Sequence, residues 1–259
     1  MYLVRHSERL DYVDRQKWIK TDRYKENESE TPITPNGYKI AKQTMIDIME
    51  NDDREIGNIY CSPSERCIQT ALEFQKQIYK KYGKKVLIKI ENGLIYWFNT
   101  IFYNTQTKIK IENNKIVLDQ SELKVIDYYM EPKEIYKRYG IDNFDSKYKP
   151  IYSVEKINAI KVNEEKSINR TIKTILKLYS KNDVDKLNIL CSHGELLYTL
   201  FAFCSKNKNM SYILPIIDKT FKSNDYCFWF KFDIKNDKVK LLEVKNKTGI
   251  HPIKNNIIT

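Results

Sequence analysis

The sequence predicts an α/β protein with three layers, in which helices cover both faces of a mostly parallel central sheet. Short apolar segments rich in β-forming residues alternate along the chain with longer segments whose apolar residues recur at helical spacing. Such alternation is typical of parallel strands joined by crossover helices. In sheets of this kind, functional groups gather in the crevice at the carboxyl ends of the strands.

The first strand is predicted over residues 2–4, which are apolar and include β-forming side chains. The segment 10–31 is polar and charged, and we expect a mobile surface loop because it has little apolar content to pack. Thr34 and Pro35 then predict the start of a helix, with Thr34 as its N-cap. The apolar spacing carries that helix to about Asn51.

The second strand is predicted over residues 56–61, and it leads directly into a helix that lasts to about Lys81. Ser62 or Ser64 is expected to cap the free N–H groups at the start of this helix. Those N–H groups also favour a bound anion. A third strand is expected over residues 86–90.

The second half of the chain shows one hairpin signal and a series of further elements. Residues 107–118 alternate around Asn113 and Asn114, which predicts a hairpin inserted around 101–120. The remaining expected elements are a short helix at 132–140, an extended loop at 141–153, a helix at 162–180, a buried strand from 187, a helix at 196–204 and two strands at 226–232 and 238–244.

Composition limits the classes of function. None of the apolar stretches reaches the roughly 20 residues of a membrane helix, and the first residues lack the apolar segment of a secretory signal. The five cysteines form no CxxC pair, which argues against a zinc site and a disulfide framework. We therefore expect one domain over residues 1–259 in a reducing, cytoplasmic compartment, with no metal, cofactor or membrane.

The net charge of +11 raises the question of a nucleic-acid partner. The lysines are scattered among Asn, Ile and Tyr along the whole length, which indicates a general bias in composition. RNA-binding and helix-turn-helix signatures are absent from the sequence. Nucleic acid is therefore not expected as a partner, and the charge acts at most as a long-range attraction for anionic substrates at low salt.

A histidine between arginines follows the first strand, at Arg5, His6 and Arg9. Neighbouring cations disfavour the protonated imidazole and lower its pKa from about 6.5. The neutral ring is a nucleophile, and guanidinium groups suit a phosphate. An Arg-His pair alone is equally consistent with an ordinary solvated strand end. Arg66 and His193 also follow strands, however, so the sheet is expected to bring all of these side chains to one crevice.

Taken together, three segments resemble the motifs of the histidine phosphatase superfamily, which is also called the phosphoglycerate mutase-like fold: Arg5–Arg9, Ser62–Ala71 and Ser192–Gly194. Their order, spacing and strand contexts agree with that family over most of the chain. Within it, the chain is most similar to the phosphatase domains of the ubiquitin-associated/SH3 (Sts) proteins. Three further segments carry this second resemblance: Glu8–Asp11, Gly93–Trp97 and, more weakly, Asp145–Pro150.

The resemblance implies a role for each residue of the crevice. His6 would attack phosphorus and become a phosphohistidine, which divides the displacement into two steps. Arg5, Arg66 and His193 would hold the phosphoryl oxygens, and Arg9 would extend the pocket. Arginines that supply the positive charge make a metal unnecessary. His251 near the end of the chain has no matching motif and is expected at the surface.

Two positions depart from the family pattern. Ser7 stands where the family usually has Gly, so its side chain would either crowd a bound phosphate or add a hydrogen bond. Tyr96 stands where the related phosphatases carry the glutamate that protonates the leaving group. Loss of a general acid costs about 10²–10⁴ in rate, and a tyrosine with a pKa of about 10 is a weak substitute.

The sequence leaves three consequences of Tyr96 open. In the first, another carboxylate, such as Glu91, Asp119 or Glu122, protonates the leaving group in place of the missing glutamate. Alternatively, the enzyme favours leaving groups that need little protonation, as in aryl phosphates or phosphotyrosine. Or the domain binds phosphorylated ligands with little turnover.

The function expected from the sequence is a metal-independent phosphatase with a phosphohistidine intermediate. Its leading rival is a relative without catalysis that serves as a phosphate-binding or scaffold module. A phosphomutase would need a donor site for a bisphosphate, which the sequence does not show. The substrate is a phosphorylated small molecule or a phosphoprotein, and a homodimer remains open because related phosphatase domains are often dimers.

Overall fold

The computed structural model describes residues 1–95, 108–112, 115–119, 129–160, 164–204, 226–235, 238–246 and 249–253. Its main sheet has seven strands, which are β1 (Tyr2–Arg5), β2 (Ile56–Cys61), β3 (Ile88–Ile90), β6 (Leu187–Ser192), β7 (Trp229–Lys235), β8 (Lys238–Asn246) and β9 (Gly249–Pro252). The strand order is β3-β2-β6-β1-β7-β8-β9. The first four strands in that order pair in parallel, and the last three are added antiparallel.

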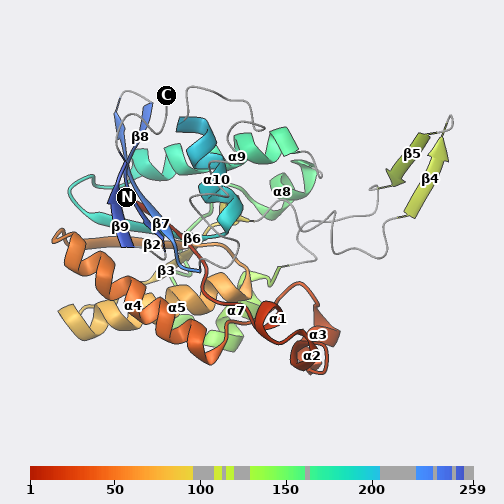
Figure 1. Cartoon of the computed structure of the whole chain (residues 1–259), viewed down its shortest axis with the longest axis horizontal. Helices are drawn as coiled ribbons and strands as arrows, with labels where there is room; N and C mark the ends of the chain where they lie inside the picture. Colours follow the sequence, from red (N-terminus) through yellow and green to blue (C-terminus); the bar gives the residue numbers. More distant parts are fainter. Residues whose placement is uncertain are drawn as a thin grey trace.

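Helices cover both faces of the sheet, as the sequence predicts (Figure 1). One face carries α4 (Pro35–Asn51), α5 (Glu65–Tyr82) and α7 (Pro132–Tyr139), and the other carries α9 (Glu164–Lys181) and α10 (Gly194–Cys204). The alternation of side chains along β1 divides the core between them. Tyr2 and Val4 pack with the α4 and α5 side, whereas Leu3 packs with the α9 and α10 side.

Residues 10–31 do not form the expected loop. They form three short helices, α1 (Leu10–Val13), α2 (Arg15–Trp18) and α3 (Asp22–Glu26). The Trp18 side chain is only 2% exposed and meets Tyr24 edge-on. The side chains of Asp14 and Thr21 cap α2 and α3. The prediction was wrong because one buried tryptophan and two caps order a segment that is otherwise polar.

The second half matches the expected elements with several additions. The hairpin strands are β4 (Lys108–Glu112) and β5 (Lys115–Asp119), which pair antiparallel. Elements that the sequence did not predict are η1 (Asn92–Leu94), η3 (Ile141–Asn143), α8 (Val154–Ile160) and β9. Over the described residues, the longest helices are too polar to span a membrane.

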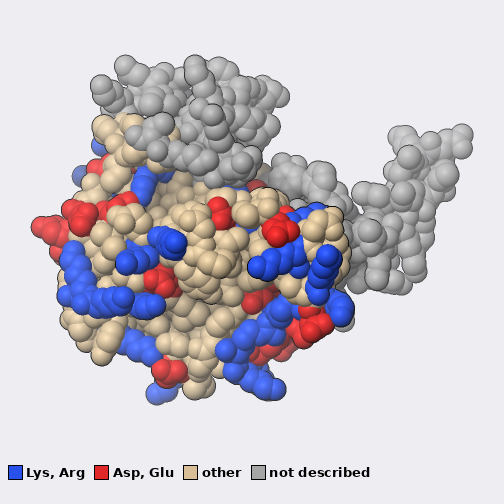
Figure 2. Space-filling model, turned by 60° about the horizontal axis from the view of Figure 1, so that its bottom comes forward, with Lys and Arg blue, Asp and Glu red and all other residues tan. Residues whose placement is uncertain are grey.

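Charged side chains of both signs share the surface formed by the α4, α5 and α7 side of the molecule. Figure 2 shows lysines and arginines interspersed with aspartates and glutamates on this face. Ion pairs at α7 and η3 include Arg138 with Glu134 and Lys85 with Asp142. A face of mixed sign does not provide the continuous basic surface that nucleic acids bind.

The contact between η1 and α9 depends on a residue without a side chain. A Cβ atom at Gly93 would lie 2.7 Å from Cγ2 and 2.9 Å from Cβ of Thr174. We expect Gly93→Ala to lower the free energy of unfolding by about 1–3 kcal/mol, as overpacking does in tight cores. Denaturant titration measures the change. Adding Thr174→Ala removes Cγ2, the nearer of these two atoms, and should restore part of the loss, whereas a single variant as stable as wild type would contradict this close contact.

Candidate active site

The crevice forms where three neighbouring parallel strands end. Hydrogen bonding continues one residue beyond the strands: the N–H of His6 donates to the Ser192 carbonyl at 2.7 Å, and that of Ser62 donates to the Cys191 carbonyl at 3.1 Å. These bonds fix the backbone of residues that follow β1 and β2. His193 follows β6 between them, so the sheet brings the three motifs together.

His6 is held as a neutral ring with one nitrogen available. Its Nδ1 lies 2.8 Å from the Ser7 carbonyl oxygen, which requires Nδ1 to donate and leaves the lone pair on Nε2. The ring is 3% exposed. Burial lowers the pKa of His6 well below its usual value, and Arg66 and Arg5 lower it further. A lowered pKa is what the sequence predicts for His6, but burial lowers it more than the neighbouring arginines do.

His193 is held by Arg66 and Ser62. Arg66 Nη2 lies 3.2 Å from His193 Nδ1, and His193 Nε2 lies 3.0 Å from the Ser62 hydroxyl. Because an arginine only donates, Nδ1 accepts, and the remaining proton is assigned to Nε2. Burial, then Arg66, lowers the pKa of His193. Its ring centre is 5.6 Å from that of His6, so the two neutral imidazoles stand side by side.

The N-terminus of α5 is capped from outside the motif. The side chain of Ser64 makes no capping bond, and the Glu65 N–H donates to the Glu30 carboxylate at 2.5 Å. The expectation of a serine cap was therefore wrong. Burial raises the pKa of Glu30 to about 8, although Arg66 acts in the opposite direction. The Ser29 carbonyl accepts a hydrogen bond from Arg66 Nη1, so the segment before α4 positions this arginine.

The other two arginines are each fixed against an aromatic ring. The Arg5 guanidinium lies over Tyr226, 5.1 Å from the ring centre, and Arg9 lies over Tyr12 at 4.3 Å. Arg9 also forms a forked pair with Asp11, with bonds of 2.9 and 2.6 Å. Cation–π contacts and a bidentate carboxylate restrict both side chains to defined orientations. The sequence indicated the arginines but not these supports.

Ser7 has a structural bond of its own. Its hydroxyl donates to the Gly37 carbonyl at 2.6 Å, and its N–H donates to the Thr70 hydroxyl at 3.0 Å. The side chain thus ties the nucleophile loop to α4. The sequence suggested that this hydroxyl would either crowd a bound phosphate or donate a hydrogen bond to it. Both effects assumed a hydroxyl that is not already bonded to the Gly37 carbonyl.

Glu91, one candidate for the missing acid, is occupied elsewhere. It is completely buried and accepts hydrogen bonds from the Gly93 N–H, the Tyr148 hydroxyl and the Ile151 N–H, at 2.6 to 2.8 Å. These three bonds connect the end of β3 to the loop before α8. The positions of Tyr96 and Glu122 and the side chain of Asp119 lie outside the described part of the chain.

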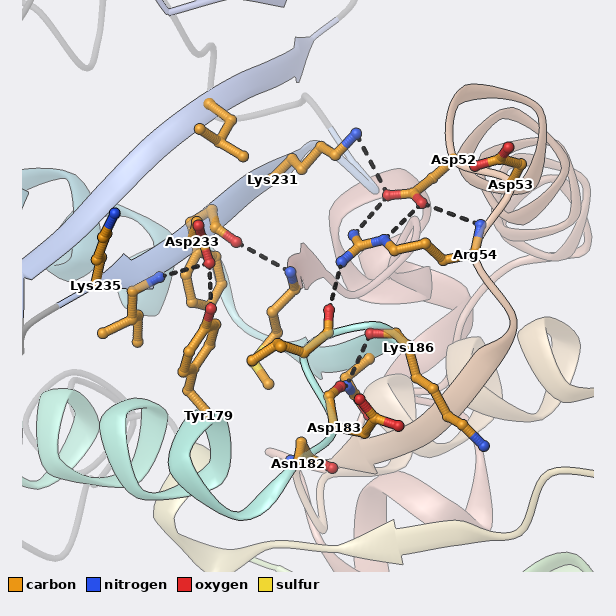
Figure 3. Close-up of a pocket in the computed structure, with 16 residues that line it drawn as sticks. Asp52, Asp53, Arg54, Tyr179, Asn182, Asp183, Lys186, Lys231, Asp233 and Lys235 are labelled. Atoms are coloured by element: carbon orange, nitrogen blue, oxygen red, sulfur yellow. Dashed lines mark hydrogen bonds and ion pairs between the residues drawn. The ribbon is translucent and has the colours of Figure 1, made fainter.

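A cavity of about 570 Å³, lined by several charged residues, opens at the opposite ends of these strands, where β2 and β6 begin (Figure 3). Its charges are largely matched within the cavity. Arg54 pairs with Asp52 at 2.7 Å, Lys231 approaches the same carboxylate at 3.3 Å, and Tyr179 donates to Asp233. The two histidines of the crevice do not line it, so it is separate from the candidate active site.

Metal ligands do not gather in the part of the chain that the structure describes. Within those residues, three or more His, Cys, Asp or Glu side chains do not come together in a group suited to a metal ion. The positive charge of the crevice comes from Arg5, Arg9 and Arg66. Such a cluster of guanidinium groups around neutral histidines is suited to an anion with several oxygens, such as a phosphoryl group.

Residues 1–94 match the family described as the histidine phosphatase superfamily, branch 1. These residues, about a third of the chain, are therefore similar to that superfamily. The matched segment contains the strand ends at His6 and Ser62 and the first turn of α5. His193 lies beyond it, and the parallel pairing of β6 with β1 and β2 brings it to the same crevice.

Two curated proteins resemble parts of this chain. Human ubiquitin-associated and SH3 domain-containing protein B is 27% identical over 120 residues, which cover 38% of this chain and 18% of that protein. An uncharacterized phosphoglycerate mutase family protein, R708 of Acanthamoeba polyphaga mimivirus, is 34% identical over 73 residues, or 28% of this chain and 34% of that protein. The matches therefore span about a fifth to a third of these relatives.

The fold extends the likeness to nearly the whole chain. The crystal structure of ecdysone phosphate phosphatase from Bombyx mori in complex with tungstate superposes with a TM-score of 0.58. The alignment covers 93% of this chain and 90% of that one, at 18% identity. The expected phosphoglycerate mutase-like fold is thereby confirmed.

Proposed function

We propose that this protein is a metal-independent phosphatase that hydrolyses phosphate monoesters through a phosphohistidine on His6. The observation that carries the proposal is the state of that ring: it is neutral, its Nδ1 donates to the Ser7 carbonyl, and Nε2 keeps its lone pair. The ring stands beside a second neutral histidine and three arginines. Phosphoryl transfer asks of a protein mainly such positioning and charge stabilisation.

Each residue of the crevice then has a role in a two-step displacement. His6 Nε2 attacks phosphorus, and Arg5 and Arg66 bind the equatorial oxygens, on which charge develops. His193 binds an equatorial oxygen through its Nε2–H, which then exchanges the Ser62 hydroxyl for the phosphoryl group. Arg9 extends the cationic pocket. Water then attacks the phosphohistidine and releases inorganic phosphate, which regenerates the histidine.

The substrates favoured by this site are aryl phosphates, including phosphotyrosine in a small molecule or protein. Tyr96 occupies the position at which the family resemblance implies a glutamate acid, and a phenol is a poor proton donor near neutral pH. A phenolate needs less protonation than an alkoxide when it leaves. The same substitution favours one alternative, a module that binds phosphorylated ligands without turnover.

Hydrolysis of p-nitrophenyl phosphate and of an alkyl phosphate in the presence of EDTA tests the proposal. We expect turnover of the aryl ester that EDTA does not reduce, and a kcat/KM for the alkyl ester that is lower by about 10-fold or more, in line with a weakened general acid. Equal rates on the two esters would contradict the aryl preference. A folded protein that binds phosphate and hydrolyses neither ester would support the binding module.

We further propose that the protein acts in a reducing compartment such as the cytoplasm. All five cysteines are free thiols, and four of them are buried. Burial raises the pKa of the Cys227 thiol to about 11, and it raises the pKa of Cys67 and Cys191 as well. Thiols with raised pKa values react slowly as nucleophiles, which is consistent with a structural role.

A further inference from the structure

One carboxylate borders the crevice and has no part in the arrangement described so far. Glu195 is the second residue of α10, which begins at Gly194 directly after His193. Gly194 lies against Arg5, because a Cβ atom at this glycine would be 3.4 Å from Arg5 Nε. The two residues before Glu195 thus belong to the wall of the pocket, and Glu195 itself is partly exposed.

The charges that act on Glu195 are those of the phosphate pocket. The guanidinium groups of Arg5, Arg66 and Arg9 each favour the ionised carboxylate, yet burial outweighs them and leaves the pKa of Glu195 raised. Within the described residues, its side chain has neither an ion pair nor a hydrogen bond to another residue. Arg5, Arg66 and Arg9 therefore act on the charge of this carboxyl group, and none of them forms a close ion pair with it.

Other carboxylates around the crevice are already engaged. Asp11 is paired with Arg9, and Glu8 accepts a hydrogen bond from the Thr34 hydroxyl at 2.5 Å. Glu30 caps α5 and is 1% exposed. Glu91, as described above, accepts three hydrogen bonds in the core. Of these carboxylates, Glu195 alone combines partial exposure with a side chain that is available to a ligand.

We infer that Glu195 is the proton donor of this phosphatase and partly replaces the acid that the family resemblance places at Tyr96, so that alkyl phosphates are hydrolysed as well, although more slowly than aryl phosphates. The inference rests on the proposed phosphatase function. Binding of a phosphate dianion beside this carboxyl group adds a negative charge, which disfavours the ionised carboxylate and favours its protonated form. The substrate thereby prepares the acid that the first step requires.

The two steps balance around this group. In the first, the His6 Nε2 lone pair forms the N–P bond, the ester P–O bond breaks, and the leaving oxygen takes the proton of the Glu195 carboxyl group. In the second, the carboxylate takes a proton from water while the water oxygen attacks phosphorus and the N–P bond breaks. Inorganic phosphate leaves, and the acid is restored for the next cycle.

Substitution Glu195→Gln, assayed with an alkyl and an aryl phosphate, tests the inference. We expect kcat/KM for the alkyl ester to fall by about 10²-fold or more, which is the usual loss for a general acid. We expect kcat/KM for p-nitrophenyl phosphate to change by less than about 3-fold, because its leaving group needs little protonation. Because the variant also lacks the base of the second step, stopped-flow mixing should show a burst of one nitrophenolate per active site. A residue that only supports the structure would produce no burst.

The matched control is Glu55→Gln, a carboxylate near the opposite edge of the sheet that pairs with Lys84 and Lys186. It should leave both rates unchanged. Three results would overturn the role of Glu195 without contradicting the phosphatase function. The variant could lose activity equally on the two esters, it could lose none on either, or the wild type could hydrolyse the aryl ester but not the alkyl one. A wild type inactive on both esters would contradict the phosphatase itself.

Discussion

Replacement of His6 by asparagine is expected to reduce kcat for p-nitrophenyl phosphate by about 10⁴-fold or more, as loss of a catalytic nucleophile does in other enzymes. The asparagine amide can still donate to the Ser7 carbonyl, as His6 Nδ1 does at 2.8 Å. The variant therefore keeps this hydrogen bond but has no ring nitrogen at the position of Nε2, so it lacks the nucleophilic lone pair. Steady-state hydrolysis measures the loss.

The fold of this variant is checked by its thermal transition and by the binding of orthophosphate. Arg5, Arg66 and His193 remain in place, so a phosphate should still bind. Residual activity above about 1% of wild type would contradict His6 as the nucleophile, since general effects of the pocket alone leave far less.

Replacement of Arg66 by glutamine is expected to lower kcat/KM by about 10³-fold, the upper range for one group that stabilises developing charge. The guanidinium is 1% exposed, and it contacts both the Ser29 carbonyl and His193 Nδ1. The variant therefore loses a cation of the pocket and also the donor that orients the second histidine. The loss should appear in kcat as well as in KM.

The matched control is Arg54→Gln at the opposite edge of the sheet, in the cavity of Figure 3. Arg54 is also a paired arginine, with Asp52 as its partner, and Lys231 remains near Asp52 after the substitution. Its kcat/KM should stay within about 2-fold of wild type, as for substitutions far from the site. Similar losses in both variants would indicate a general effect of charge or stability instead of contact with the phosphoryl group.

The parallel half of the fold and the crevice could be predicted from the sequence because each depends on local signals. Thr34 and Pro35 define the start of α4, where the Thr34 hydroxyl accepts the Gly37 N–H. The strand ends at His6 and His193 are visible as buried apolar segments followed by polar residues. Register then follows from the parallel pairing of neighbours, which aligns Arg5 with Ser192.

The supports of the site could not be predicted because they come from distant or unremarkable positions. Glu30 lies in a segment whose polar composition suggested a loop, yet it caps α5, 35 residues further along the chain. Ser62 was expected as a helix cap, but its hydroxyl lies beside His193, which is 131 residues away in sequence. A cap and a histidine partner require the same side-chain type, and only the fold distinguishes the two uses.

The most direct test of the account is to trap the covalent intermediate on His6. Wild-type protein is mixed with p-nitrophenyl phosphate, quenched with alkali within milliseconds and digested for mass spectrometry. The account predicts a phosphate that is stable to alkali and labile to acid on the peptide that contains His6, and none on the peptide that contains His193. Turnover with no phosphorylated His6, or with the phosphate on another residue, would contradict it.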